Sequence, residues 1–189
     1  AIAVIAAVSA VLVLKRYWRT LGYWLAAVGF AQALVWILKA TLGRARPIAM
    51  YSGTEQFSFP SGHIANSIVL YGFLAVLLSR GKAPRIKMVL ALAAVLLIVL
   101  ITCSRLYLGA SWLSDAVASL GLGTAWVALL STAHTQHAGD ERLPARAMSL
   151  AALGAMALAG TAVIATQHAM DVARYAPAQA ATRALPAEW

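Results

Sequence analysis

Four basic residues lie at the ends of apolar segments, where a charged side chain is energetically costly. They are Lys39, Arg44, Arg46 and Arg105. Long basic side chains that reach the membrane interface explain such a cluster taken alone, but a charge near the end of an apolar run is by default a functional hypothesis. A phosphoryl group spreads its charge over three equatorial oxygens, which several cations stabilise together. We therefore expect Lys39, Arg46 and Arg105 to bind one phosphate group.

The sequence Pro60-Ser61-Gly62-His63 adds neutral donors and an acid to these cations. It opens a helix, so the Ser61 hydroxyl and the Gly62 amide are expected to face an anion. Gly62 lets that anion approach the backbone closely. His63 is the nearby group that gives a proton to a leaving oxygen around neutral pH.

The third polar group lies in the sequence SRLYLGASWLSD, residues 104–115. A covalent route needs a nucleophile that a carboxylate orients, and Asp115 is such a carboxylate. The residue four positions earlier lies on the same helix face, and that residue is Ser111. The alternative is a purely structural ion pair between Arg105 and Asp115.

Together the three groups resemble the signature of the type-2 phosphatidic acid phosphatase superfamily. Lys-x6-Arg-Pro is matched by Lys39, Arg46 and Pro47, and Pro-Ser-Gly-His by residues 60–63. Ser-Arg-x5-His-x3-Asp is matched by Ser104, Arg105 and Asp115, but its histidine falls on Ser111. The similarity covers roughly residues 20–130.

The resemblance implies a phosphatase that uses no metal and no other cofactor. Lys39, Arg46 and Arg105 would hold the phosphate with Ser61 and Gly62, and His63 would protonate the leaving group. The family's nucleophile is the third-motif histidine, which the aspartate orients and which forms a phosphohistidine that water cleaves. The expected partners are membrane lipids, with a lipid phosphate or pyrophosphate as substrate.

Ser111 changes this expectation, because a serine hydroxyl is a weak nucleophile without an adjacent base. We expect a chain that binds phosphate but turns over very slowly or not at all. The otherwise intact signature favours a deliberate substitution at residue 111, and a naturally degenerate binding protein is the other explanation. The family reading also leaves open a phosphotransferase, whereas a haloperoxidase is disfavoured because that chemistry resides in soluble proteins.

The composition identifies an integral membrane protein. Of 189 residues 62% are hydrophobic and 11% are charged, with a mean hydropathy of +0.79, whereas soluble domains are about a quarter charged. The net charge of +9 does not indicate nucleic acid, because the basic residues sit in short loops between apolar runs. Cys103, the only cysteine, excludes an internal disulfide.

The expected fold is all-α, a polytopic membrane bundle of about six transmembrane helices. The apolar segments are Ala1–Leu14, Leu21–Leu38, Gly62–Ser79, Met88–Cys103, Leu113–Ala133 and Ala147–Thr166. The first is expected to be truncated, with a fused or N-terminal domain missing before it. Met88–Cys103 is short, and we expect Lys87 to extend its reach towards the interface. Residues 1–167 are predicted to form the membrane-embedded domain, and residues 168–189 a tail or linker.

The loops alternate between two sides of the membrane. One side carries nine Lys and Arg residues and the side with the three motifs carries six, so the first is predicted to be cytoplasmic. The motifs then face the periplasm or the exterior of a bacterial inner membrane. A transporter is the weakest alternative, because its polar residues should cross the membrane and these gather on one side. A lipid-phosphate-binding or regulatory module without chemistry stays open.

Overall fold

The computed structural model describes residues 1–46, 57–138, 141 and 143–175. Its helices are α1 (Ile2–Leu14), α2 (Trp18–Leu42), α3 (Gly62–Ser67), the π-helical segment η2 (Ile68–Gly72), α4 (Phe73–Ser79), α5 (Pro84–Tyr107), α6 (Leu113–Ala138) and α7 (Ala145–Tyr175). The elements α3, η2 and α4 follow one another without a break and cross as one unit, Gly62–Ser79. The predicted all-α fold is confirmed.

The helices suit a membrane by both length and surface. Within the described ranges, five helices are long and apolar enough to cross a bilayer, whereas Ile2–Leu14 is shorter. Helix α5 buries little of itself and exposes large apolar side chains along its length, among them Leu92, Leu96 and Leu100. Such a surface is stable against lipid and not against water. The chain is therefore an integral membrane protein.

The helices α2, α5, α6 and α7 extend beyond the apolar segments predicted from the sequence, and two of these differences bear on other predictions. Helix α5 begins at Pro84, which fits the first turn of a helix because it has no N–H to satisfy. Lys87 therefore lies inside a 24-residue helix and is not needed to extend a short one. Helix α7 continues to Tyr175, beyond the predicted end at Thr166. The division into residues 1–167 and 168–189 stays a prediction.

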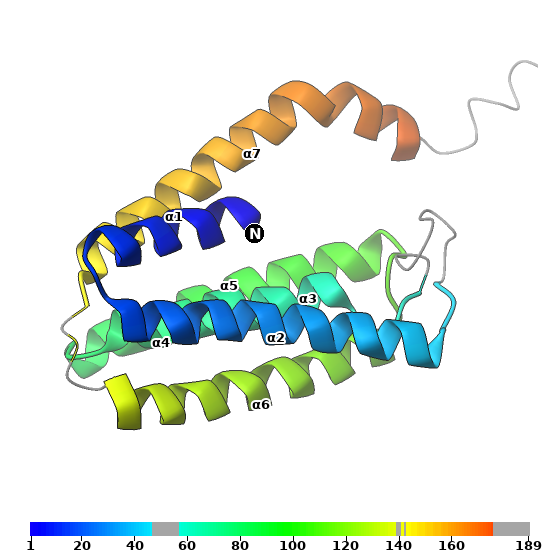
Figure 1. The fold of residues 1–189 in the computed structure, drawn as a ribbon. Coiled ribbons are helices and arrows are strands. Elements are labelled where there is room, and N and C mark those ends of the chain that lie inside the picture. The colour runs from blue at the N-terminus through cyan, green and yellow to red at the C-terminus, as the bar shows by residue number, and fades with distance from the viewer. Residues whose placement is uncertain (47–56, 139–140, 142, 176–189) are drawn as a thin grey trace, which may run out of the picture.

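The helices run back and forth between two ends of the bundle (Figure 1). At one end α2 and α5 finish and α3 and α6 begin, so the three polar motifs meet there. We call this the motif end. Helix α1 lies along α7, beside the bundle that α2 to α6 form. The core between these layers includes Trp24 and Phe73, whose rings stack with 6.5 Å between centroids.

The opposite end is held by a partly buried chain of hydrogen bonds centred on His134. Arg80 Nη1 lies 2.6 Å from His134 Nδ1, and Thr20 Oγ1 lies 2.9 Å from His134 Nε2. The Thr20 hydroxyl also donates to Glu141 Oε2 at 2.6 Å. Arginine only donates, so Nδ1 accepts and Nε2 carries the hydrogen. His134, fully buried, therefore joins α2, α6 and the segments that follow α4 and α6.

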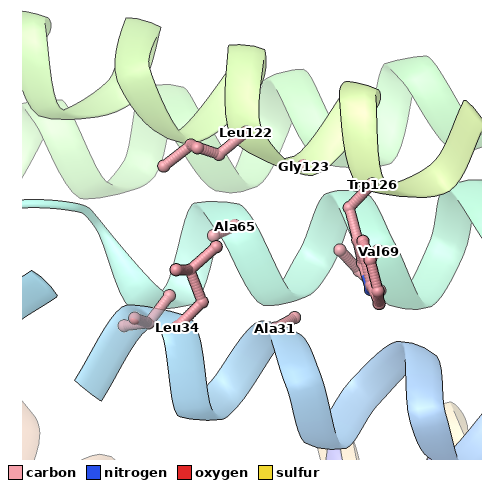
Figure 2. A pocket seen from close by; sticks show the side chains of 8 residues that line it. Ala31, Leu34, Ala65, Val69, Leu122, Gly123 and Trp126 are labelled. Carbon is pink, nitrogen blue, oxygen red and sulfur yellow. The ribbon is translucent and has the colours of Figure 1, made fainter. Parts of the chain in front are cut away.

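Close packing in the core positions the motif-bearing helices. Figure 2 shows small and apolar side chains where α2, α3, η2 and α6 converge, namely Ala31, Leu34, Ala65, Val69, Leu122 and Trp126, with Gly123 among them. The space they leave is about 20 Å³ and too small for a lipid headgroup. A Cβ on Gly123 would lie 2.8 Å from Ile68 Cγ2 and 2.9 Å from Ile68 Cβ. Gly123 thus lets α6 approach η2.

Substituting this glycine should loosen the contact between α6 and η2. Overpacking a core costs about 1–3 kcal/mol, whereas Gly→Ala gains at most about 1 kcal/mol of helix propensity. We expect Gly123→Ala to lower the melting temperature in detergent micelles. Gly121→Ala is the matched control, because nothing lies within 4 Å of its added Cβ. Equal melting temperatures for the two variants would contradict the proposed role of Gly123.

Candidate active site

The first motif ends α2 and turns the chain towards α6. Lys39 is 3% exposed, and its carbonyl accepts the N–H of Gly43 at 3.1 Å. Gly43 has φ of 57°, a left-handed conformation that glycine adopts readily and that ends the helix. The loop is then fixed by Ser58, whose N–H donates to the Arg44 carbonyl at 2.7 Å. Pro47 of the predicted signature lies outside the described residues.

The second and third motifs touch at two buried hydroxyl groups. Ser61 Oγ lies 3.0 Å from Ser111 Oγ, and the side chains are 2% and 3% exposed. Ser119 of α6 donates to the Ser61 carbonyl at 3.2 Å, which fastens the turn before α3 to α6. The structure therefore brings together Ser61 and Ser111, which are 50 residues apart in the sequence.

The Arg46 side chain and the Arg105 backbone both contact the turn before α6. Arg46 Nη1 donates to the Ala110 carbonyl, which joins the first motif to the residue before Ser111. The Ala110 N–H in turn donates to the Arg105 carbonyl at 3.1 Å. Arg46 and Arg105 are both half-buried. All three motifs thus converge on the short connection between α5 and α6.

Asp115 is fully buried and forms an ion pair with Arg44. Arg44 Nη1 lies 2.9 Å from Asp115 Oδ1, and the Trp112 N–H donates to Asp115 Oδ2 at 3.0 Å. The loop after α2 thus folds back over the start of α6 and brings Arg44 to the buried carboxylate. The Arg105–Asp115 pair considered from the sequence stays a prediction.

A further set of contacts at this site was not predicted from the sequence. The Trp112 indole N–H donates to the Ala45 carbonyl at 3.0 Å, and the Arg44 guanidinium lies 5.8 Å from the centre of the Trp112 ring. Arg44 also donates to the Ser114 hydroxyl at 2.8 Å. The available signal was that Arg44 stands two residues from Arg46 in one basic loop. These contacts hold the first loop against the third motif.

His63 lies at the start of α3, and its side chain is exposed. It lines a cavity of about 370 Å³ whose other walls come from α2, η2, α5 and Ala1. Gly62 also lines this cavity, and a Cβ there would lie 3.1 Å from Val35 Cγ1 of α2. Glycine therefore lets the start of α3 pack closely on α2, with His63 turned into the neighbouring space.

Comparison with known proteins assigns the chain to a family. Residues 20–138 match the PAP2 superfamily, and the chain belongs to that superfamily. The family predicted from the three motifs is thereby confirmed.

A curated relative adds one named activity. Phosphatidylglycerophosphatase B of Bacillus subtilis (strain 168) is 35% identical over 91 residues, which cover 46% of this chain and 44% of the relative. The match thus spans less than half the length of that relative. No solved structure matches significantly.

Proposed function

We propose that this chain carries the phosphate-binding site of a membrane lipid-phosphate or lipid-pyrophosphate phosphatase, with turnover stopped at Ser111. The observation that carries the proposal is the buried 3.0 Å contact between Ser61 and Ser111 Oγ atoms. It supports a single pocket built from motifs that are far apart in the sequence. Membership of the PAP2 superfamily supports the same reading.

Within this proposal each motif has a separate task. Lys39, Arg46 and Arg105 bind the phosphate oxygens, with donors from the Ser61 hydroxyl and the Gly62 amide. Cations and fixed donors together stabilise the charge of a phosphoryl group in transfer. No metal or other cofactor enters this scheme.

The proton and the nucleophile come from the remaining positions. His63 donates a proton to the leaving oxygen as the bond from phosphorus to that oxygen breaks. The nucleophile belongs at residue 111, where the family has histidine, and Asp115 orients it. In a working enzyme the imidazole nitrogen bonds to phosphorus, and water then cleaves that bond.

The hydrogen-bond partner that the structure gives Ser111 is a hydroxyl, which is not a base that would make it a nucleophile. That hydroxyl belongs to Ser61 and does not remove protons near neutral pH. The Asp115 carboxylate already accepts hydrogen bonds from Arg44 and the Trp112 amide. A phosphoserine ester, if formed, would also be harder to hydrolyse than a phosphohistidine. Binding without turnover is the expected behaviour.

The membrane supplies the substrate in this proposal. The site faces the periplasm or the exterior of a bacterial inner membrane, because the motif end carries fewer basic residues than the other end. The lipid tails stay in the bilayer while the headgroup reaches the motif end. The name of the Bacillus relative makes phosphatidylglycerol phosphate the first substrate to test.

A binding or regulatory module without chemistry is the second candidate function, and Ser111 itself favours it. If serine is the native residue at this position, the protein would bind the anion in the pocket without hydrolysing it. The two candidates share the pocket and differ in whether a histidine at residue 111 gives turnover.

Phosphate binding is the direct test of the pocket. We expect Arg105→Ala to weaken binding of phosphatidylglycerol phosphate in neutral detergent micelles by about tenfold or more, because it removes a charge-assisted hydrogen bond. Arg85→Ala is the matched control, since Arg85 is exposed at the other end of the same helix. An equilibrium titration gives both affinities. Equal loss in the two variants, or no loss in either, would contradict the proposed pocket.

A further inference from the structure

A groove on the outer side of the bundle lies between α4, α5 and α6, away from the motif end. Its volume is about 380 Å³, and small residues make room for it, namely Gly72, Ala75, Ala91, Ala94 and Ala128. The other side of α5 carries large exposed side chains, among them Leu96 and Leu100. Of the α5 side chains, all of which the structure describes, only Ile98 is buried. The groove therefore lies where this spanning helix packs most thinly against its neighbours.

The groove extends along one half of the bilayer. Ser79, Lys87 and Ser131 line it towards the end of the bundle opposite the motif end, and Ile98 lines it at mid-helix. Between Lys87 and Ile98 the axis of α5 advances by roughly 16 Å. Half of a hydrocarbon core that is about 30 Å thick is nearly the same length. The groove thus has the length of a lipid acyl chain in one leaflet.

The hydroxyl groups in the groove wall are satisfied by their own helices. The Ser79 hydroxyl donates to the Val76 carbonyl at 2.8 Å. The hydroxyls of Thr124 and Ser131 each donate at 2.6 Å to the carbonyl four residues earlier. Because these hydrogens are already in use, the wall offers mainly dispersion contacts. Such a wall suits a hydrocarbon chain better than a polar ligand.

Lys87 places a positive charge at one end of the groove. Residues 80–87 include four basic residues and no acidic one, and Lys87 is the member of that set that lines the groove. Its side chain is exposed, and a lysine near a helix end extends its amine to the interface. Membrane topology explains basic residues in this segment, but it does not explain an apolar groove that ends at one of them. The combination matches a ligand with an acyl chain and an anionic head.

We infer that this groove binds an anionic phospholipid, with one acyl chain along α5 and its phosphate at Lys87. The site is separate from the proposed substrate pocket, because Lys87 lies in the first turn of α5 and Arg105 in its last. A bound chain fills the space between α5 and the neighbouring helices α4 and α6. The lipid therefore stabilises the fold and takes no part in the reaction.

Melting temperatures in neutral detergent micelles test the site, with added phosphatidylglycerol or with phosphatidylcholine of the same acyl chains. A ligand that binds the folded state raises the melting temperature, and we expect a larger rise with phosphatidylglycerol. Ala128→Phe fills the groove and should remove most of that rise. Ala125→Phe is the matched control and should keep it, because Ala125 is exposed on the same helix and lies outside the groove. Each variant is compared with itself without lipid, so a change in its own stability does not affect the result.

The role of Lys87 has its own pair of variants. We expect Lys87→Gln to weaken binding of phosphatidylglycerol by about fivefold. Lys82→Gln should change it little, since Lys82 belongs to the same basic segment but does not line the groove. An equal loss in both variants would mean general attraction to a basic surface, and it would overturn the inference.

Three further outcomes would also overturn the inference. The first is an equal rise with phosphatidylcholine, which would remove the selectivity for anionic lipid. The second is a rise that Arg105→Ala abolishes and Ala128→Phe does not, which would place the lipid at the motif end. The third is a dimer in micelles that Ala128→Phe dissociates, which would make a second copy of the chain the occupant of the groove.

Discussion

Replacing Ser111 with histidine should restore phosphate release from a lipid phosphate. Loss of a catalytic nucleophile costs up to about a millionfold in turnover, so we expect Ser111→His to raise release by on the order of a thousandfold or more. The site supports this change because residue 111 lies at the contact with Ser61 and because Arg46 holds the preceding carbonyl. An imidazole there is a good nucleophile near neutral pH, and its phosphoramidate is labile. Release of inorganic phosphate from phosphatidylglycerol phosphate in mixed micelles is the measurement.

The size of the new side chain needs a control, because residue 111 is only 3% exposed. Ser111→Gln adds a polar side chain of similar volume without a nucleophile, and we expect it to stay at the parent's rate. A phosphoryl adduct that is lost in acid should accumulate in Ser111→His alone. If the histidine variant folds and binds the lipid but releases no more phosphate than Ser111→Gln, the phosphatase proposal is wrong and the binding module stands.

The helical architecture could be predicted because apolar runs of sufficient length specify membrane helices without any knowledge of their neighbours. The meeting of the motifs could also be predicted, since alternating loops put Ser61 and Ser111 at the same end of the bundle. Their direct contact follows that expectation. Boundaries were less predictable. Helix α5 begins at Pro84 because the first turn of a helix accommodates proline. The prediction from hydrophobicity began this segment at Met88 and so missed its first turn.

The pairings at the site could not be predicted, because they depend on how helices rotate about their own axes. Gln32 and Asn66 lie on different helices, and nothing in the spacing of either sequence signals their 2.6 Å contact. The pairing of Asp115 with Arg44 depends on the path of a loop, which the pattern of charges leaves open. The π-helical segment Ile68–Gly72 is a similar case, since its residues also suit an α-helix.

Asp115 should be indispensable once the nucleophile is present. In the Ser111→His background we expect Asp115→Asn to lower kcat by about ten-thousandfold, as loss of an orienting carboxylate does in a hydrolytic triad, with KM little changed. The reason is electrostatic, because a carboxylate fixes the imidazole tautomer and stabilises positive charge on the ring, and an amide does neither. Asparagine keeps the shape and an acceptor for the Trp112 N–H. In the parent with Ser111 the same change should have no effect on turnover.

Asp115 could act by orienting the histidine at residue 111 or by forming its ion pair with Arg44. Arg44→Gln in the same background distinguishes these two roles. The Arg44 side chain is 43% exposed whereas the Asp115 side chain is buried, so water screens this pair from the arginine side only. The Trp112 N–H still donates to the carboxylate after the change. We therefore expect Arg44→Gln to lose less turnover than Asp115→Asn, with Asp115 released from Arg44 and available to the imidazole. Steady-state kinetics of both variants give the comparison. If Arg44→Gln loses as much turnover as Asp115→Asn, the carboxylate acts by holding the loop after α2 in place, and its proposed role as the orienting group is refuted.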